Sequence, residues 1–343
     1  MKVAVVILNW NGYNYLKKFL PLVVQHTQSD DCRVIVADNA STDDSIELLN
    51  VEFPEVQVIS LSKNYGFAEG YNRALAQIDA EYFVLLNSDV ETTENWLEPM
   101  LEYMDTHPEV AACQPKIRAY NNRSKFEHAG AAGGYVDKFG FPFCRGRVFG
   151  NVETDNGQYD TVTEIFWATG ACMLTRSETF RKVGGFDADF FAHMEEIDLC
   201  WRFNARGLKV VCVPQSIVYH VGGGTLSTES PYKTYLNFRN NLLMLYKNLP
   251  QNLLVEILEA RFFFDYAAAL QMLLTGKFSN AYAVYKARRD FALMQNRFAD
   301  KRNENIRFST CQSCPTIYSR SIVVEYYLKR RKTFARLMAL LVK

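Results

Sequence analysis

Near its start the chain reads Val3-Ala4-Val5-Val6-Ile7-Leu8-Asn9-Trp10-Asn11-Gly12, a short apolar run that leads directly into polar residues. β-branched residues dominate the run, which favours a β-strand, and the run is too short for a signal peptide. Similar runs recur, with helix-like segments between them, at 33–37, 56–61, 82–86 and 110–113. Apolar runs that do not alternate with polar residues indicate strands covered on both faces. We therefore predict an α/β fold with a mostly parallel central sheet flanked by helices.

Small polar and acidic side chains follow four of these predicted strands. They are Asn9 and Asn11, then Asp38 and Asn39, then Asn64, Gly66 and Asn72, and finally Asn87, Ser88 and Asp89. Any one of these segments could be a turn or a helix cap. Ligands of parallel sheets bind beyond the carboxyl ends of the strands, however, and four such segments in succession favour a site at that edge. Amide and hydroxyl groups suit a base and a ribose, and Asp89 suits a hard divalent cation.

The composition is that of an ordinary globular protein, with 48% apolar residues, 18 Gly and 10 Pro among 343 residues. Eight cysteines are scattered, mostly inside apolar runs, as expected for buried thiols in a reducing cytosol. The close pair Cys311 and Cys314 lacks the second pair or the two histidines of a usual zinc site, so we expect a structural role. We expect a cytoplasmic protein.

Two common nucleotide-binding motifs are missing from the sequence. A dinucleotide-binding fold would carry G-x-G-x-x-G after the first strand, where Gly12 alone occurs. The P-loop pattern G-x-x-x-x-G-K-[ST] is absent as well. These observations exclude a classical dinucleotide-dependent oxidoreductase and a P-loop NTPase.

Residues 186–202 read FDADFFAHMEEIDLCWR and place five carboxylates among aromatic and apolar residues. Apolar neighbours raise the pKa of a carboxylate, so this stretch could hold a general base. Acidic residues also stabilise the start of a helix, and Asp198 is spaced for an ordinary surface pair with Arg202. The stretch alone leaves both readings open.

Two further regions complete the predicted site. Residues 116–170 lack clear periodicity and are rich in glycine, which predicts an irregular insertion over the site, and Trp167, Thr169 and Gly170 then lead back to the sheet. His220 precedes a run of three glycines that would let the backbone approach a ligand. A lone histidine is usually structural, but beside an Asp89 metal site it becomes a candidate ligand.

The C-terminal third has a different character. Residues 232–300 are helix-like, and a last helix is expected over Ile322–Val342. Residues 286–343 carry 14 Lys and Arg against 4 Asp and Glu, a net charge of +10. Basic and apolar residues together favour an anionic membrane surface, and a solvated basic face on a packed helix is the alternative. Nucleic-acid binding is disfavoured because no recognition module is present.

Seven motifs occur in order over residues 3–225: NWNG at 9–12, DNASTD at 38–43, NYGFAEGYN at 64–72, NSD at 87–89, GGFD at 184–187, EEIDLCWR at 195–202 and YHVGGG at 219–224. On these motifs the chain resembles the inverting glycosyltransferases of family 2, in particular the rhamnosyltransferase-like enzymes of bacterial cell-surface polysaccharides. The resemblance implies the GT-A fold, with a catalytic domain over 1–225 and a mainly helical extension over 226–343. Residues 1–115 would form the nucleotide-binding half of the domain and 116–225 the acceptor-binding half.

The resemblance also implies roles for individual residues. Asn9, Asn11, Asp38 with Asn39, and the 64–72 segment that carries Gly66 would contact the base and ribose of the donor. NSD matches the D-x-D metal motif of the family, so Asp89, with His220, would hold Mg²⁺ or Mn²⁺ at the diphosphate. Asn87 departs from the first Asp of that motif and would bond the ribose instead, and Ser88 would lie with it on the donor side. Trp167, Thr169 and Gly170 would lie on the acceptor side.

The family base is the Asp of an E-D pair, and here that position is Glu196. Because Glu adds a methylene, Glu195 remains the alternative base.

The implied reaction transfers a sugar from a nucleotide-diphosphate sugar to a hydroxyl of a lipid-linked or polysaccharide acceptor, at the inner face of the membrane. Two other classes remain open. A sugar nucleotidyltransferase would release diphosphate from sugar phosphate and nucleoside triphosphate, and a non-catalytic nucleotide-sugar or glycan-binding module would turn nothing over.

Overall fold

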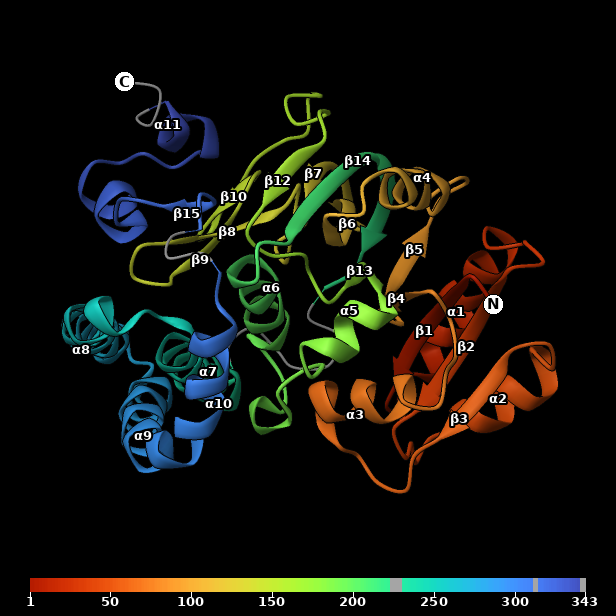
Figure 1. Cartoon of the computed structure of the whole chain (residues 1–343), viewed down its shortest axis with the longest axis horizontal. Helices are drawn as coiled ribbons and strands as arrows, with labels where there is room; N and C mark the ends of the chain where they lie inside the picture. Colours follow the sequence, from red (N-terminus) through yellow and green to blue (C-terminus); the bar gives the residue numbers. More distant parts are fainter. Residues whose placement is uncertain (223–229, 311–313, 340–343) are drawn as a thin grey trace.

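The structure is a computed structural model that describes residues 1–222, 230–310 and 314–339. Its central sheet contains ten strands (Figure 1). Eight of them follow one path across the sheet: β12 (Thr163–Ile165), β14 (Lys209–His220), β6 (Val110–Ala119), β13 (Cys172–Arg176), β4 (Tyr82–Leu86), β1 (Val3–Asn9), β2 (Cys32–Asp38) and β3 (Gln57–Ser60). Two short strands flank this path, β5 (Val90–Thr92) on β14 and β7 (Asn122–Phe126) on β6.

The strands predicted from the apolar runs are present, and β3, β2, β1 and β4 are parallel to one another. Their register places Asn9 opposite Asp38 and Ile7 opposite Leu86, so the carboxyl ends of the strands are level. Beyond β4 the sheet is mixed, because β13 runs antiparallel to both β4 and β6. The segment before β13 therefore reaches the same edge as the carboxyl end of β4.

Both faces of the parallel strands are covered. Ala4 and Val6 belong to one buried cluster, and Val3, Val5 and Ile7 belong to another, so successive side chains of β1 enter different cores. This explains why the run does not alternate. The helices of this part of the chain are α1 (Tyr13–Gln25), α2 (Ser45–Glu52), α3 (Gly66–Leu75), α4 (Glu98–Thr106), α5 (Ser177–Lys182) and α6 (Glu195–Ala205).

The expectation of an irregular insertion over residues 116–170 is wrong in part, because short strands interrupt it. Four of them form a second, five-stranded sheet with a strand from the C-terminal region: β11 (Asn151–Val152), β10 (Arg147–Val148), β9 (Pro142–Cys144), β8 (Gly134–Asp137) and β15 (Ile317–Tyr318). These strands have only two to four residues, so they show too few alternations to give a detectable period. Glycines at positive φ, such as Gly140 and Gly146, make their turns.

The helical C-terminal region is confirmed for the described residues. It contains α7 (Pro231–Asn248), α8 (Gln251–Leu274), α9 (Phe278–Met294), a 3₁₀ turn over Gln295–Phe298 and α10 (Ala299–Phe308). Figure 1 shows these helices gathered on the side of the molecule away from β1–β3, with α7 against α6. Among the described helices none has the length and hydropathy needed to cross a membrane.

The single helix expected over Ile322–Val342 is also wrong where the structure describes it. A π-helical turn covers Val324–Leu328 and a short α11 covers Phe334–Met338, and between them Arg330 has a φ of 55°. The helix stops there because Phe334 turns into the second sheet, where its ring packs against Tyr135 and Tyr159. Residues 340–342 lie outside the described part, as do Gly223, Gly224 and Cys311 of the sequence motifs.

Candidate active site

The turns after β1 and β2 are joined by a hydrogen-bond network. Asn9 is buried, and its amide Nδ2 donates to Asp38 Oδ1 and to Ser41 Oγ, each over 3.1 Å. Asn9 Oδ1 is buried without a hydrogen-bond partner. Ser41, which sequence reasoning did not single out, also donates its hydroxyl to Asp38 Oδ1 over 2.5 Å. The network fixes Asp38 at the edge and leaves one amide oxygen unsatisfied, as expected where a ligand completes the bonding.

Asn11 connects the same two turns from the solvent side. It has a φ of 51°, and its side-chain oxygen accepts a hydrogen bond from the backbone N–H of Thr42 over 2.7 Å. A side chain on Gly12 would collide with Asn9 Oδ1 and would lie 3.5 Å from Ser88 Oγ. The first turn and Ser88 are therefore adjacent, as predicted for residues at one sheet edge.

The segment after β3 is bound to this edge through Asn39. Its amide donates to Asn64 Oδ1 over 3.1 Å and to the carbonyl of Gly66 over 3.0 Å. Gly66 has a φ of 76°, and a Cβ there would lie 2.5 Å from the ring of Phe191. Glycine is therefore required both by the backbone and by the approach of Phe191.

Asn72 does not face the edge. Its side chain accepts from the N–H of Phe186 over 3.0 Å and donates to the carbonyl of Phe186 over 2.8 Å. The N–H of Phe67 donates to the carbonyl of Phe191 over 2.7 Å. These contacts tie α3 to the segment before α6, so Asn72 positions that segment.

Asp89 and His220 meet as predicted, and Glu127 joins them. His220 Nε2 lies 3.1 Å from Asp89 Oδ1, and His220 Nδ1 lies 3.4 Å from Glu127 Oε2. All three side chains are buried. Burial alone would lower the pKa of His220, but the two carboxylates raise it to about 10. Burial would raise the pKa of Asp89, and the bond to His220 lowers it below its usual value. Sequence reasoning missed Glu127 because β7 brings it back to β14 from a stretch without a motif.

The donor set at Asp89 suits a divalent metal ion only in part. A carboxylate and an imidazole are ligands that Mn²⁺ accepts, and Mg²⁺ favours the carboxylate. The imidazole lies between the two carboxylates, however, and among the described residues no three His, Cys, Asp or Glu side chains converge as ligands for one ion. Asp89 and His220 therefore fit as a partial site that a ligand with its own oxygens would complete.

Asn87 and Ser88 are half-buried beside this site, and the N–H of Asn87 donates to the carbonyl of Ala171 over 3.0 Å.

The segment before β13 is buried. The indole of Trp167 donates to the carbonyl of Tyr135 over 3.0 Å, and the N–H of Thr169 donates to Gln114 Oε1 over 3.0 Å. A Cβ on Gly170 would lie 2.9 Å from the Phe67 ring. The side chains of Trp167 and Thr169 are thus buried in the protein, and their place on the acceptor side stays a prediction.

The predicted base residues occupy the first turn of α6. Glu195 is 4% exposed and Glu196 is half-buried, and in each side chain Oε2 is buried without a hydrogen-bond partner. Burial raises the pKa of Glu196 to about 7. Burial, with the nearby Glu196 and Asp198, raises the pKa of Glu195 well above its usual value. Unpaired buried carboxylates with raised pKa values are typical of catalytic acids and bases.

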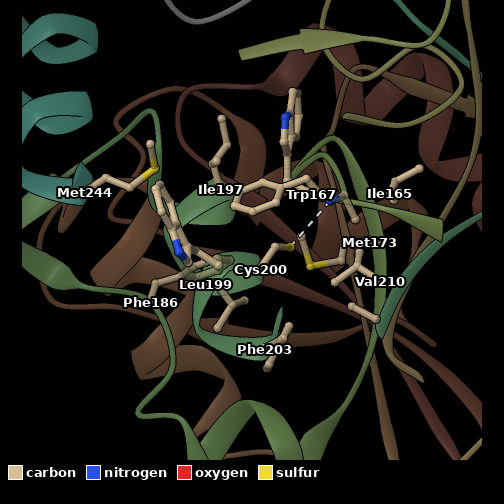
Figure 2. Packing of buried hydrophobic residues seen from close by; sticks show 14 of the residues in the cluster. Ile165, Trp167, Met173, Phe186, Ile197, Leu199, Cys200, Phe203, Val210 and Met244 are labelled. Atoms are coloured by element: carbon tan, nitrogen blue, oxygen red, sulfur yellow. Dashed lines mark hydrogen bonds between the residues drawn. The ribbon is translucent and has the colours of Figure 1, made fainter. Parts of the chain in front are cut away.

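The segment that leads into α6 has an unusual backbone. Phe191, His193 and Met194 all have φ between 66° and 73°, and no side chain caps the helix start. Burial and the nearby Lys233 lower the pKa of His193 to about 4, so its imidazole is neutral at neutral pH. Behind this segment the body of α6 is well packed. Figure 2 shows its side chains among those of β12, β13, β14 and α7, with Cys200 Sγ accepting from Ala168 N over 3.4 Å.

Helix α7 holds this segment from the other side. The Asn240 amide Nδ2 donates to the carbonyls of Phe190, Ala192 and His193 over 2.9, 2.9 and 2.8 Å. Arg239 donates to the carbonyl of Phe190 over 3.2 Å. Sequence reasoning missed both residues, because their partners are backbone carbonyls that leave no pattern in the sequence.

A buried ion network strengthens the same contact. Lys247 Nζ lies 2.7 Å from Asp187 Oδ2 and 2.9 Å from Asp198 Oδ2. Asp198 also pairs with Arg202 at 3.0 Å, as the spacing predicted, but the pair is buried where a surface pair was expected. Lys301 of α10 adds a second cation on Asp187. Burial would raise the pKa of Asp187, and Lys247 and Lys301 together hold it well below its usual range.

Comparison with known proteins gives a consistent result. The family model described as Glycosyl transferase family 2 matches residues 4–184, more than half of the chain. The N-acetylglucosaminyl-diphospho-decaprenol L-rhamnosyltransferase of Mycobacterium tuberculosis is 26% identical over 64% of this chain and 75% of its own length. The rhamnosyltransferase WbbL of Escherichia coli is 26% identical over 64% of this chain and 83% of its own. GalNAc-T7, solved with UDP, GalNAc and Mn²⁺, superposes with a TM-score of 0.59 at 14% identity, over 92% of this chain and 58% of that one. The GT-A fold is confirmed.

The raised pKa of Glu196 makes stability depend on pH. The folded chain holds the proton up to about pH 7, whereas the usual Glu value is 4.5, so stability falls as pH rises through this window. Glu196→Gln removes the free-energy cost of ionising this carboxyl group in the folded chain. We expect the variant to be more stable than the unchanged chain at about pH 8, by on the order of 1–3 kcal/mol, with no gain at about pH 4. Urea unfolding at both pH values measures this.

The exposed Glu178 of α5 provides the control, because Glu178→Gln should change stability at neither pH. A Glu196→Gln variant whose stability matches the unchanged chain at every pH would show that the carboxylate is solvated in the folded state.

Proposed function

Because the chain belongs to glycosyl transferase family 2 and is a glycosyltransferase, we propose that it moves a sugar from a nucleotide-diphosphate donor to an acceptor hydroxyl with inversion at the anomeric carbon. One observation carries the proposal: Glu195 and Glu196 each hold a buried, unpaired carboxylate oxygen, and they follow a segment that Phe67 and Asn72 of α3 hydrogen-bond, next to the nucleotide-side turns. A single displacement needs one base, because the nucleoside diphosphate is already a good leaving group.

The donor would be held at the edge of β1, β2 and β4. Asp38 and the unpaired Asn9 Oδ1 offer acceptors for donor N–H and O–H groups, while Asn11 and Ser88 border the same turn. Asn39, Asn64 and Gly66 shape the adjoining wall through their mutual hydrogen bonds. Asn87 stands between this wall and Asp89, where its amide suits the ribose.

Asp89 would hold Mg²⁺ or Mn²⁺ together with the donor diphosphate, and His220 would join it as a neutral imidazole after giving up its imidazole proton when the ion binds. When bound, the ion would offset the negative charge that develops on the leaving diphosphate. GalNAc-T7, which shares the fold, was solved with Mn²⁺ and UDP, and this supports a divalent ion here. Glu127 would act behind the site by fixing the orientation of the His220 ring.

We favour Glu196 over Glu195 as the base. Glu196 is the more exposed of the two, so an acceptor hydroxyl can reach it, and a pKa of about 7 suits proton uptake at neutral pH. Glu195 is 4% exposed, and with its proton retained it would remain neutral beside the working base. Glu196 would take the proton of the acceptor hydroxyl as that oxygen attacks the sugar.

The relatives suggest the acceptor class. One is a rhamnosyltransferase whose name specifies a diphospho-decaprenol acceptor, and another is the rhamnosyltransferase WbbL. We therefore propose a nucleotide-activated deoxyhexose as donor and a lipid-linked glycan as acceptor, in the synthesis of a cell-surface polysaccharide. The enzyme would bind such an acceptor at the cytoplasmic face of the membrane.

Replacement of the base should separate chemistry from binding. Glu196→Gln is expected to lower the rate of transfer by about 10²–10⁴-fold, the usual contribution of a general base, with donor affinity nearly unchanged. Glu195→Gln should lose less, because Glu195 would not take the proton. Product formation by mass spectrometry and donor binding by calorimetry measure the two quantities. Full turnover by Glu196→Gln would refute the assignment, and a greater loss in Glu195→Gln would exchange the two roles.

Removal of the proposed metal ligand should affect the donor. Asp89→Asn is expected to weaken Mn²⁺-dependent binding of the nucleoside diphosphate by about 10–100-fold, because the ion loses its only protein carboxylate. Asp44→Asn, at an exposed carboxylate before α2, is the control and should bind as the unchanged chain does. Calorimetric titration with and without Mn²⁺ measures both. An equal response to Mn²⁺ in Asp89→Asn would contradict a metal site at this residue.

A further inference from the structure

The hairpin of α8 and α9 presents large apolar side chains to solvent. Phe263, Leu274 and Phe278 are 73%, 80% and 67% exposed. They are joined by other exposed side chains on the same hairpin, namely Phe262, Leu270, Leu273, Tyr282 and Tyr285. Scattered apolar residues are normal on a protein surface, but eight large exposed ones on one hairpin, with Phe262 against Phe263 and Tyr282 against Tyr285, indicate a contact surface. We call these exposed side chains the hairpin face.

The exposed charged residues nearest the hairpin face in sequence are basic. Between Phe262 and Arg289 they are Lys277, Lys286 and Arg289, of which Arg289 is paired with Asp290, and the exposed acids Glu256 and Glu259 lie earlier on α8. The acid in this stretch, Asp265, is buried and paired with Arg261 and Arg288. The surface therefore combines apolar side chains with basic ones and presents no exposed carboxylate over this stretch. That combination complements an anionic lipid surface and is unfavourable for contact with a second basic face.

The basic C-terminal segment borders the same surface. Tyr327 and Leu328 are 63% and 77% exposed and precede Lys329, Arg330, Arg331 and Lys332. A groove of about 430 Å³ lies between this segment and α8, lined by residues that include Phe264, Val324 and Lys329. Figure 1 shows α8, α9 and the C-terminal segment on the side of the molecule away from β1–β3. Glu325 pairs with Lys329 and Arg331, so Arg330 and Lys332 carry the uncompensated charge here.

We propose that the hairpin face, flanked by the basic C-terminal segment, docks the enzyme on an anionic lipid bilayer. This inference rests on the proposed lipid-linked acceptor for its purpose. The exposed apolar side chains of α8 and α9 enter the headgroup region, and the lysines and arginines contact lipid phosphates. The sequence suggested membrane contact through a basic C-terminal helix. The structure instead favours the α8–α9 hairpin as the main point of attachment.

The position of α7 links this surface to the catalytic carboxylates. A groove of about 530 Å³ between α7 and α9 is lined by Tyr232, Tyr235, Phe278, Tyr282 and Lys286 among others. At its inner end the ring of Tyr232 lies 6.5 Å from that of Phe191, in the segment that precedes Glu195. Docking through the hairpin face therefore brings the active-site segment to the membrane side of the enzyme, where a lipid-linked hydroxyl is presented.

Vesicle co-sedimentation of the full chain tests the proposal. The probes are vesicles of phosphatidylcholine alone and of phosphatidylcholine with phosphatidylglycerol. We expect binding to the anionic vesicles that weakens with added salt. The triple variant Phe263→Ser/Leu274→Ser/Phe278→Ser should bind roughly 100-fold more weakly, because three apolar side chains no longer enter the bilayer. Lys277→Ala/Lys286→Ala should bind roughly 30-fold more weakly to anionic vesicles, at about fivefold per basic residue.

Val51→Ser/Phe308→Ser is the matched control, because both residues are exposed apolar side chains outside the hairpin face, on α2 and α10. Point variants are needed, since truncation after residue 320 would remove the buried Phe334 and Leu337 from the second sheet. Far-UV circular dichroism checks that each variant is folded. Equal vesicle binding by the triple variant and the unchanged chain would overturn the proposal, as would failure of the unchanged chain to bind anionic vesicles.

Two further outcomes separate this inference from the proposed function. Light scattering that shows a dimer lost in the triple variant, without vesicle binding, would assign the hairpin face to a second copy and overturn bilayer docking. Vesicle binding requires neither donor nor acceptor, so Glu196→Gln should bind vesicles as the unchanged chain does. Vesicle binding by a chain that transfers no sugar would support docking and refute the proposed function alone.

Discussion

The arrangement of the active site depends on one polar contact, the Asn240 amide of α7 bonded to the carbonyls of Phe190, Ala192 and His193. These carbonyls belong to a segment in which Phe191, His193 and Met194 are left-handed, a conformation that costs of order 1–3 kcal/mol for each such residue. A backbone of this kind persists only when its surroundings determine it. The buried Lys247 adds to the contact by joining Asp187, before the segment, to Asp198, inside α6.

This contact joins the C-terminal helices to the segment that carries the proposed catalytic carboxylates. The carboxylates of Glu195 and Glu196 follow the strained segment immediately, so α7 and α10 set where these carboxylates stand relative to the nucleotide edge. Their buried, unpaired oxygens are unfavourable for the fold, and their raised pKa values express that cost. The well-packed body of α6, with Leu199, Cys200 and Phe203 fully buried, stabilises the helix that carries them.

The sequence predicted the parallel strands and the residues at their carboxyl ends because both depend on local pattern. The apolar runs are continuous since each strand is covered on two faces. Polar residues mark where these runs stop: Asn9 and Asp38 are the last residues of β1 and β2, and Asp89 lies in the turn after β4. Asn72 was predicted at the sheet edge, but its side chain hydrogen-bonds the backbone of Phe186 instead. A sequence motif does not show in which direction a side chain points. Glu127 and Asn240 could not be found, since β7 and α7 bring them to the site from distant parts of the chain. The final helix was expected from a stretch that mixes basic and apolar residues, and the burial of Phe334 against the second sheet interrupts it.

We propose that α7 positions the proposed catalytic carboxylates, Glu195 and Glu196, without binding the donor. The most direct measurement is the rate of sugar transfer and the donor dissociation constant of Asn240→Ala, compared with Asn237→Ala, whose amide donates to the carbonyl of Lys233 in its own helix. We predict that Asn240→Ala lowers kcat by about 100-fold at unchanged donor affinity, because a displacement near 1 Å misaligns the base, while Asn237→Ala behaves as the unchanged chain. An unchanged kcat in Asn240→Ala, or a loss confined to donor affinity, would contradict the claim.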